Sequence, residues 1–175
     1  MNILPMRNRA NTQGLMDLIN ILPNDITMAE IGCYMGESTR MFLESNKIKH
    51  LYAIDIWDDN LGIYKDILPN HDFKIVEKKF DENTKNYDVT KLKMTSEEAL
   101  PFLPELDVIY IDANHSYEYV KKDIEISLKK LKRNGIICGH DYNSETEGVI
   151  QAVNEYFEKP DIVFSDSSWL TFIKR

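Results

Sequence analysis

The chain has little of the material that builds secreted, membrane or nucleic-acid-binding proteins. Its 175 residues contain only two cysteines, Cys33 and Cys138, which is too few for a disulfide framework of the secreted type. No apolar run approaches the roughly 20 residues that span a bilayer. The net charge is −8 and the basic clusters are short, so the molecule as a whole repels polyanions. We therefore expect a cytoplasmic protein that binds no membrane and no long nucleic acid.

The sequence also lacks internal repeats, low-complexity tracts and linkers rich in glycine, serine or proline. A chain of 175 residues fits one domain, and a hydrophobic content of 43% supports a packed core. We expect a single domain over residues 1–175, with residues 1–25 as a helical segment packed on it. The sequence does not reveal the oligomeric state, so a homo-oligomer is left open.

What the sequence does contain is a regular alternation of strand-like and helical segments. Short apolar runs predict strands at 26–31, 51–56, 89–94, 107–112, 135–139, 161–164 and 169–173. The spacing of apolar residues predicts helices at 11–22, 37–46, 96–102, 117–131 and 148–157, with one or two more within 58–87. Since strands apolar on both faces belong to covered parallel sheets, the pattern predicts an α/β protein, a three-layer α-β-α sandwich with a mostly parallel sheet. Its last two strands are close enough in sequence to pair as a hairpin.

The first glycine-containing turn follows the first predicted strand, in the pattern E-x-G-x-x-x-G-x-S from Glu30 to Ser38. Gly32 allows a turn with positive φ, and Gly36 lets a ligand approach the backbone. The following helix would direct its unpaired N–H groups at the same place. An acid beside amide donors suits a zwitterionic amino-acid group better than a pyrophosphate, whose sites show G-x-G-x-x-G. A purely structural turn remains the alternative.

Asp55 ends the second predicted strand, where a carboxylate can accept hydrogen bonds from both hydroxyls of a ribose. A turn or helix-capping aspartate is the alternative. Trp57, two residues on, is read either as a wall for an adenine or as a core residue. Thr95 and Ser96 follow the third predicted strand, where a loop contacts the base in such folds, and Ser96 also fits a helix N-cap.

Polar residues gather after the fourth and fifth predicted strands. Asp112, Asn114 and His115 follow one, and His140 and Asp141 follow the other. Adjacent parallel strands would place the two aspartates close together, and carboxylates that close require a cation, a proton or a tight network. Mg²⁺ takes such oxygen ligands, and His115 could then remove a proton from a substrate hydroxyl. A solvated histidine without a role is the alternative.

The order of these motifs resembles that of known enzymes. The segments E-x-G-x-x-x-G-x-S, I-D-x-W, V-I-Y-I-D-A-N-H-S-Y-E and N-G-I-I-C-G-H-D-Y resemble class I, Rossmann-like methyltransferases dependent on S-adenosylmethionine. The chain is most similar to the small bacterial branch that includes sugar O-methyltransferases of macrolide and aminocoumarin biosynthesis. The resemblance covers roughly residues 29–157. It implies a seven-stranded sheet with an antiparallel last strand.

The resemblance also implies roles for individual residues. Asp112 and His115 would be catalytic, and Asp112, Asp141 and His140 would hold Mg²⁺ or another divalent cation. One departure is that His140 stands where metal-dependent relatives often carry an acid, although Mg²⁺ prefers oxygen ligands. The positions expected to bind S-adenosylmethionine are Glu30, Gly32, Cys33, Gly36, Ser38, Thr39, Asp55, Ile56, Trp57, Thr95, Ser96, Asp112, Asn114 and His115.

The reaction expected from this resemblance is O-methylation of a small-molecule acceptor, with a sugar-like or other hydroxyl, assisted by the divalent cation. A non-catalytic protein that binds S-adenosylmethionine or S-adenosylhomocysteine is the alternative. A nicotinamide-dependent oxidoreductase is a weaker alternative, because the third glycine is missing and Glu30 adds an acid. The acceptor would contact residues 58–87 and the loop at 143–147, in which we read no chemistry.

Overall fold

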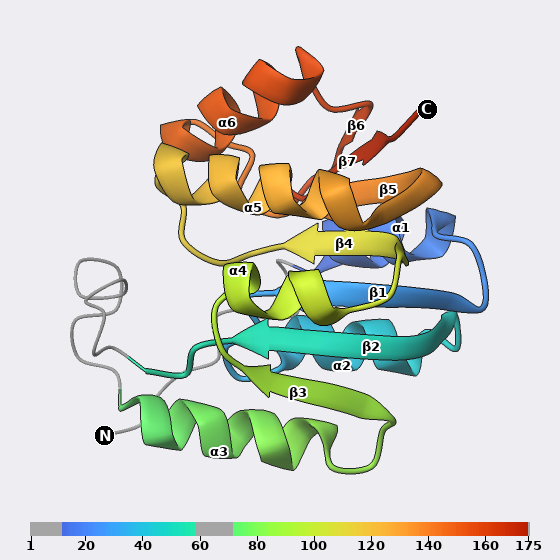
Figure 1. The fold of residues 1–175 in the computed structure, drawn as a ribbon, viewed down its shortest axis with the longest axis vertical. Helices are drawn as coiled ribbons and strands as arrows, with labels where there is room; N and C mark the ends of the chain where they lie inside the picture. The colour runs from blue at the N-terminus through green and yellow to red at the C-terminus, as the bar shows by residue number, and fades with distance from the viewer. Residues whose placement is uncertain (1–11, 59–71, 175) are drawn as a thin grey trace.

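A computed structural model describes residues 12–58 and 72–174 of the protein (Figure 1). Within these residues, seven strands form one sheet: β1 (Ile26–Ile31), β2 (Ile48–Asp55), β3 (Val89–Lys93), β4 (Leu106–Ile111), β5 (Leu131–Gly139), β6 (Ile162–Val163) and β7 (Trp169–Phe172). Their order across the sheet is β3-β2-β1-β4-β5-β7-β6. Strands β1 to β5 pair in parallel, whereas β7 pairs antiparallel with both β5 and β6. The predicted hairpin and the predicted antiparallel last strand are therefore both confirmed.

Helices cover both faces of this sheet (Figure 1). They are α1 (Gln13–Ile21), α2 (Glu37–Glu44), α3 (Phe73–Thr84), α4 (Ser96–Ala99), the short 3-10 helix η2 (Leu100–Phe102), α5 (Tyr117–Lys130) and α6 (Glu147–Phe157). Two separate hydrophobic clusters result, because neighbouring strand residues point to opposite faces. One joins α1, α2 and α3 to residues such as Met28 and Tyr110, and the other joins α4, α5 and α6 to Ala29 and Ile109. The predicted three-layer sandwich is confirmed.

Three local predictions need correction. Thr95, not Ser96, is the N-cap of α4, and it forms a capping box with Glu98. With Ser96 as the N-cap, the position three residues later is Ala99, so the sequence does not show the glutamate of a capping box. The predicted helix 96–102 is two pieces, α4 and η2, where Pro101 stands at the start of η2. Strand β5 begins at Leu131, four residues before the predicted start, since Leu131 pairs with β4 across an irregular register.

The N-terminal helix is held by the last hairpin. The carboxylate of Asp166, in the turn before β7, accepts hydrogen bonds from the backbone N–H of Leu15 at 2.8 Å and of Ser168 at 2.9 Å. Residue 14 is a glycine, and a Cβ at this position would stand 2.0 Å from a carboxylate oxygen of Asp166. A larger residue would therefore block this contact. Helix α1 lies in the predicted segment 1–25, of which residues 1–11 lie outside the described part. No described helix is both long and apolar enough to cross a membrane.

The chain changes direction across the sheet at β1. From β1 it proceeds outward through β2 and β3, and β4 then returns to the other side of β1. In open α/β sheets a ligand binds beyond the carboxyl ends of the strands at such a switch point. Here the loops after β1 and β4 start at Gly32 and Asp112, whose N–H groups still bond to Ile54 and Ile31, each at 2.8 Å. The fold therefore places both polar loops side by side.

Candidate functional site

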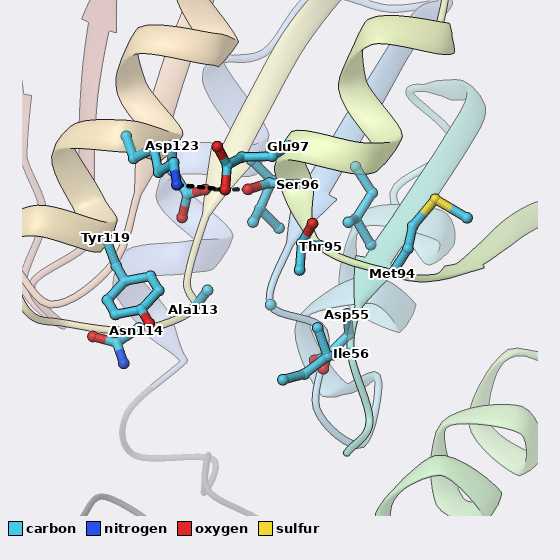
Figure 2. Close-up of a pocket in the computed structure, with 14 residues that line it drawn as sticks. Asp55, Ile56, Met94, Thr95, Ser96, Glu97, Ala113, Asn114, Tyr119 and Asp123 are labelled. Atoms are coloured by element: carbon cyan, nitrogen blue, oxygen red, sulfur yellow. Dashed lines mark hydrogen bonds and ion pairs between the residues drawn. The ribbon is translucent and has the colours of Figure 1, made fainter. Parts of the chain in front are cut away.

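A pocket opens at this switch point, between the loops that follow β1, β2, β3 and β4 (Figure 2). About 560 Å³ of space lies within it, the open solvent at its mouth included. Six of the predicted cofactor positions belong to its wall: Gly32, Asp55, Ile56, Thr95, Ser96 and Asn114. The remaining wall is formed by Ile31, Ile54, Met94, Glu97, Ala113, Tyr119, Lys122 and Asp123.

The glycine turn is dictated by sterics. Gly32 has φ of +85°, and a Cβ there would stand 2.2 Å from the carbonyl oxygen of Asp112. Any residue with a Cβ would clash at this close approach of β1 to the β4 loop. The observed φ confirms the predicted positive φ at Gly32. Gly36 also has a positive φ, +78°, and caps α2. A Cβ at Gly36 would approach the ring of Phe80 from α3 at 2.9 Å.

Asp55 holds this turn in place. One of its carboxylate oxygens accepts hydrogen bonds from the backbone N–H of Cys33 at 2.9 Å and of Tyr34 at 2.8 Å, and the other accepts from Trp57 at 3.0 Å. Burial raises the pKa of Asp55, and these N–H donors oppose the rise. The carboxylate thus organises the loop that follows β1, at the position where the sequence predicts a contact with ribose.

The other predicted cofactor positions near β1 are buried and are not part of the pocket wall. Glu30 is fully buried and accepts a hydrogen bond from Ser38. Trp57 is 2% exposed, donates to the carbonyl of Tyr34 at 2.8 Å and packs on Phe80, with ring centroids 4.6 Å apart. Trp57 therefore occupies the core, as one of its two interpretations expected. Cys33, Gly36 and Thr39 are also outside the pocket wall.

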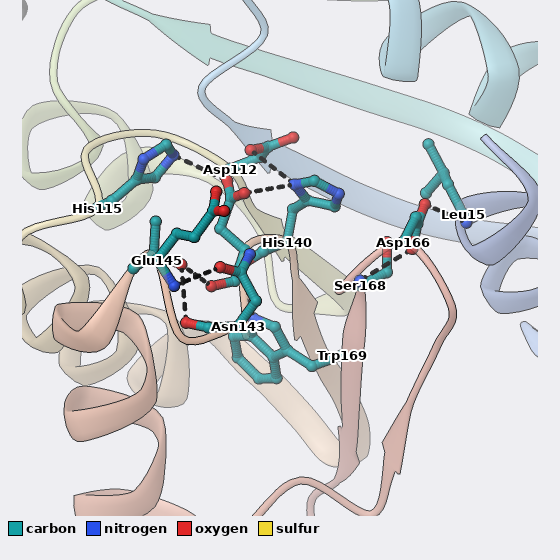
Figure 3. Close-up of polar contacts among 11 residues, drawn as sticks. Leu15, Asp112, His115, His140, Asn143, Glu145, Asp166, Ser168 and Trp169 are labelled. Carbon is teal, nitrogen blue, oxygen red and sulfur yellow. Dashed lines mark hydrogen bonds and ion pairs between the residues drawn. The ribbon is translucent and has the colours of Figure 1, made fainter. Parts of the chain in front are cut away.

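The acids and histidines of the β4 and β5 loops come together (Figure 3). His115 Nε2 lies 2.9 Å from one carboxylate oxygen of Asp141, and His140 Nδ1 lies 3.1 Å from the other. His140 Nδ1 also lies 4.0 Å from Asp112. Three possible metal-ligating atoms lie within 4.8 Å of one another, one each from Asp112, His115 and Asp141. They are close enough to bind the same metal ion. This set contains His115 where the sequence predicted His140, which lies beside it.

These contacts set the charges of the cluster. The hydrogen bond with Asp141 raises the pKa of His115 above its ordinary value, although burial opposes this. Burial raises the pKa of Asp141, but hydrogen bonds from His115 and His140 outweigh burial and bring that pKa below its ordinary value. Asp141 is therefore ionised at neutral pH, and His115 retains a proton more readily than a free histidine.

Helix α6 fixes the backbone of this cluster. Asp141 has φ of +62°, an uncommon conformation for a residue with a side chain, and Thr146 donates a hydrogen bond to its carbonyl. Gly148, in the first turn of α6, lies so close to the β4 loop that a Cβ would stand 2.5 Å from the carbonyl oxygen of His115. The position of His115 thus depends on α6 as well as on β4.

Eight residues of the pocket wall were not among the predicted site positions, and three of them lie on α5: Tyr119, Lys122 and Asp123. Of these three residues, Asp123 could have been recognised from the sequence. It is buried on α5 together with Val120 and Ile124, and it is only 7% exposed. A charged residue at a buried helix position signals either a paired charge or a binding site.

Comparison with known proteins identifies the family. The family model described as "Methyltransferase domain" matches residues 29–142, more than half of the chain. The chain belongs to this methyltransferase family. The match includes every loop of the pocket described above and ends next to Asp141. The predicted resemblance to class I methyltransferases, whose methyl donor is S-adenosylmethionine, is confirmed.

Solved structures agree with the methyltransferase fold. The O-methyltransferase NovP has a TM-score of 0.65 at 21% identity, over 95% of this chain and 78% of NovP. An O-methyltransferase from Bacillus cereus, in complex with SAH, has 0.63 at 16% identity, over 98% and 84%. A ribosomal protein L11 methylase from Lactobacillus delbrueckii subsp. bulgaricus has 0.67 at 20% identity, over 98% and 81%. Two of these proteins are named as O-methyltransferases and the third for a ribosomal protein, so the shared fold does not specify an acceptor.

A curated relative is the uncharacterized protein R132 of Acanthamoeba polyphaga mimivirus, 28% identical over 141 residues. The match covers 75% of this methyltransferase chain but only 59% of the viral protein. The relative is therefore longer than the domain described here.

Proposed function

We propose that the protein transfers a methyl group from S-adenosylmethionine to a hydroxyl oxygen of a small-molecule acceptor. The observation that carries this proposal is the His115–Asp141 pair, which lies one loop away from the pocket at the switch point. Residues 112–115 join the two sites, because Asn114 is part of the pocket wall and His115 belongs to the cluster. An acceptor bound beside this loop would then meet both the methyl group of the cofactor and the base.

The pocket offers suitable groups for the cofactor. Asp55 and Gly32 would hold its ribose, and Ile56, Met94 and Ala113 would contact its adenine. The buried acid Glu30 and the first N–H groups of α2 would favour its methionine end. When bound, S-adenosylmethionine supplies an electrophilic methyl group on a positively charged sulfur.

His115 is the proposed general base. Its Nε2 bonds to Asp141, which orients the imidazole and leaves the lone pair of Nδ1 to accept a proton from the acceptor hydroxyl. A hydroxyl is a poor nucleophile until that proton leaves, and a well-placed base contributes about 10²–10⁴-fold to rate. Alignment of the reacting atoms by the two loops supplies the remaining rate increase.

The cluster also fits a divalent cation. Two carboxylates and an imidazole offer donor atoms within 4.8 Å of one another, and His140 steadies Asp141 from the other side. Asp112 and Asp141 would hold the ion, with His115 or His140 beside it. When bound, such an ion supplies positive charge that favours an ionised acceptor oxygen and disfavours a protonated His115.

The test measures formation of S-adenosylhomocysteine with a panel of sugars and other hydroxyl compounds. With any acceptor that turns over, His115→Ala should lower kcat about 10²–10⁴-fold, and binding of S-adenosylhomocysteine should change less than about threefold, because His115 is not part of the pocket wall. His50→Ala is the matched control, since His50 contacts Thr90 on β3 instead. Unchanged kcat in His115→Ala would reject the base. Loss of activity in EDTA, restored by Mg²⁺, supports the cation, and full activity in EDTA rejects it.

A further inference from the structure

Asp123 is a buried acid that the proposed reaction does not use. It lies on α5, is 7% exposed and is part of the pocket wall. Figure 2 shows Asp123 and Ser96 at one end of the pocket, and Asp55 and Ile56 at the other. A ribose held at Asp55 would therefore direct its base towards Asp123.

The surroundings of Asp123 leave one of its oxygens available. Ser96 donates a hydrogen bond to Oδ1, while Oδ2 has no hydrogen-bond partner among residues 12–58 and 72–174. The charged groups nearest to it are Glu97 of α4 and Lys122 of α5, which bond to each other at 2.5 Å. Because Lys122 is engaged by Glu97, no cation of the described part neutralises Asp123 directly. A largely buried carboxylate in the pocket wall favours a ligand that donates a hydrogen bond to it.

The pocket wall also contains apolar side chains, those of Ile31, Ile54, Ile56, Met94 and Ala113. A flat aromatic base fits such a wall, and its edge would meet the acid. An ionised carboxylate only accepts hydrogen bonds. Adenine carries a donor at this edge, its 6-amino group, whereas hypoxanthine carries a carbonyl oxygen in the same place.

We propose that Asp123 selects the cofactor base, by accepting a hydrogen bond from the 6-amino group of adenine, and that Ser96 positions the carboxyl group. This inference rests on the proposed use of S-adenosylmethionine. It assigns base specificity to α5, outside the loops that the sequence motifs identify. A purely structural Asp123 would only link α4 to α5 through Ser96, and an asparagine would serve equally well for that link.

The experiment compares two ligands by isothermal titration calorimetry: S-adenosylhomocysteine and its deaminated analogue S-inosylhomocysteine. At pH 8 the unmodified protein should prefer the adenosyl ligand by about 100-fold or more, because the carboxylate would face a carbonyl oxygen in the inosyl ligand. Asp123→Asn should weaken adenosyl binding about tenfold and strengthen inosyl binding, since an amide can donate to that oxygen. The preference should fall below about tenfold. Ser96→Ala, the matched control, should weaken both ligands and keep the preference.

A second measurement needs no variant. The pKa of Asp123 is raised to about 6, mainly because the side chain is buried. The charge of Glu97 raises this pKa further, whereas the Ser96 hydrogen bond and the charge of Lys122 lower it. At pH 5 the protonated carboxyl can donate to the inosyl carbonyl, so the preference of the unmodified protein should shrink at least about tenfold from its value at pH 8.

The outcomes separate this inference from the proposed function. If the unmodified protein binds both ligands within threefold at pH 8, or if Asp123→Asn keeps the preference, the assignment of Asp123 is wrong while cofactor binding stands. If the preference of the unmodified protein is the same at pH 5, the assignment is also wrong. If S-adenosylhomocysteine does not bind at millimolar concentration, the proposed function fails, and this inference fails with it. Thermal melts of each variant report whether it is folded.

Discussion

The carboxylate of Asp55 is expected to be the main polar support of the loop after β1. In Asp55→Asn, the amide oxygen can still accept from Cys33 and Tyr34, but the amide nitrogen would face the N–H of Trp57. One buried donor then loses its partner, at a cost of about 1–3 kcal/mol. Two charge-assisted bonds become neutral ones, at about 1 kcal/mol each. Relief from burying a charge offsets part of this, so we expect a net loss of about 2–4 kcal/mol.

Urea unfolding followed by circular dichroism at pH 7 measures this loss by linear extrapolation. Asp88→Asn is the matched control, because the Asp88 side chain is 88% exposed and lies 3.7 Å from His50. An exposed pair of this kind should change stability by less than about 1 kcal/mol. If Asp55→Asn were as stable as Asp88→Asn, the loop would not depend on an ionised carboxylate, and the reasoning would be refuted. Binding of S-adenosylhomocysteine should weaken together with stability.

Three further predictions concern single positions. Gly32→Ala should destabilise the protein by about 2 kcal/mol or more and abolish cofactor binding. The reason is that φ is +85° and a Cβ would stand 2.2 Å from the Asp112 carbonyl oxygen. Thermal melts with and without S-adenosylhomocysteine that match those of the unmodified protein would contradict this prediction. Gly148→Ala should lower kcat at least about tenfold with little effect on cofactor affinity, because it displaces the His115 backbone; kinetics and calorimetry test this. Stability should rise by up to about 3 kcal/mol from pH 7 to pH 4 through Asp123, whose raised pKa of about 6 makes its charged form unfavourable. Asp123→Asn should remove that part of the slope in urea unfolding.

Most of the fold follows from periodicity in the sequence. Apolar runs such as Ile26–Ile31 are recognisable because a covered parallel strand is apolar on both faces, and Gly32 marks the turn after it. Boundaries were harder to predict. The start of β5 at Leu131 depends on pairing with β4, and the N-cap at Thr95 depends on a side-chain bond to Glu98. Such contacts are tertiary or specific to one rotamer, so periodicity does not reveal them.

The candidate site was predictable where it follows strand ends. Asp112 and Asp141 could be placed together because β4 and β5 are adjacent, and the structure brings them together with His115. The hydrogen bonds from backbone N–H groups to Asp55 were not predictable, because they depend on how the loop after β1 folds back. Asp123 was not predicted, because it lies on a helix face and the predicted site residues all lie at or after strand ends.

The contact between Asp166 and the first turn of α1 has a consequence for synthesis of the chain. Leu15 and the aspartate that accepts its N–H are 151 residues apart in the sequence. A ribosome therefore makes α1 long before it makes Asp166. This bond of α1 can form only after β1 to β6 have been synthesised and Asp166 has left the exit tunnel.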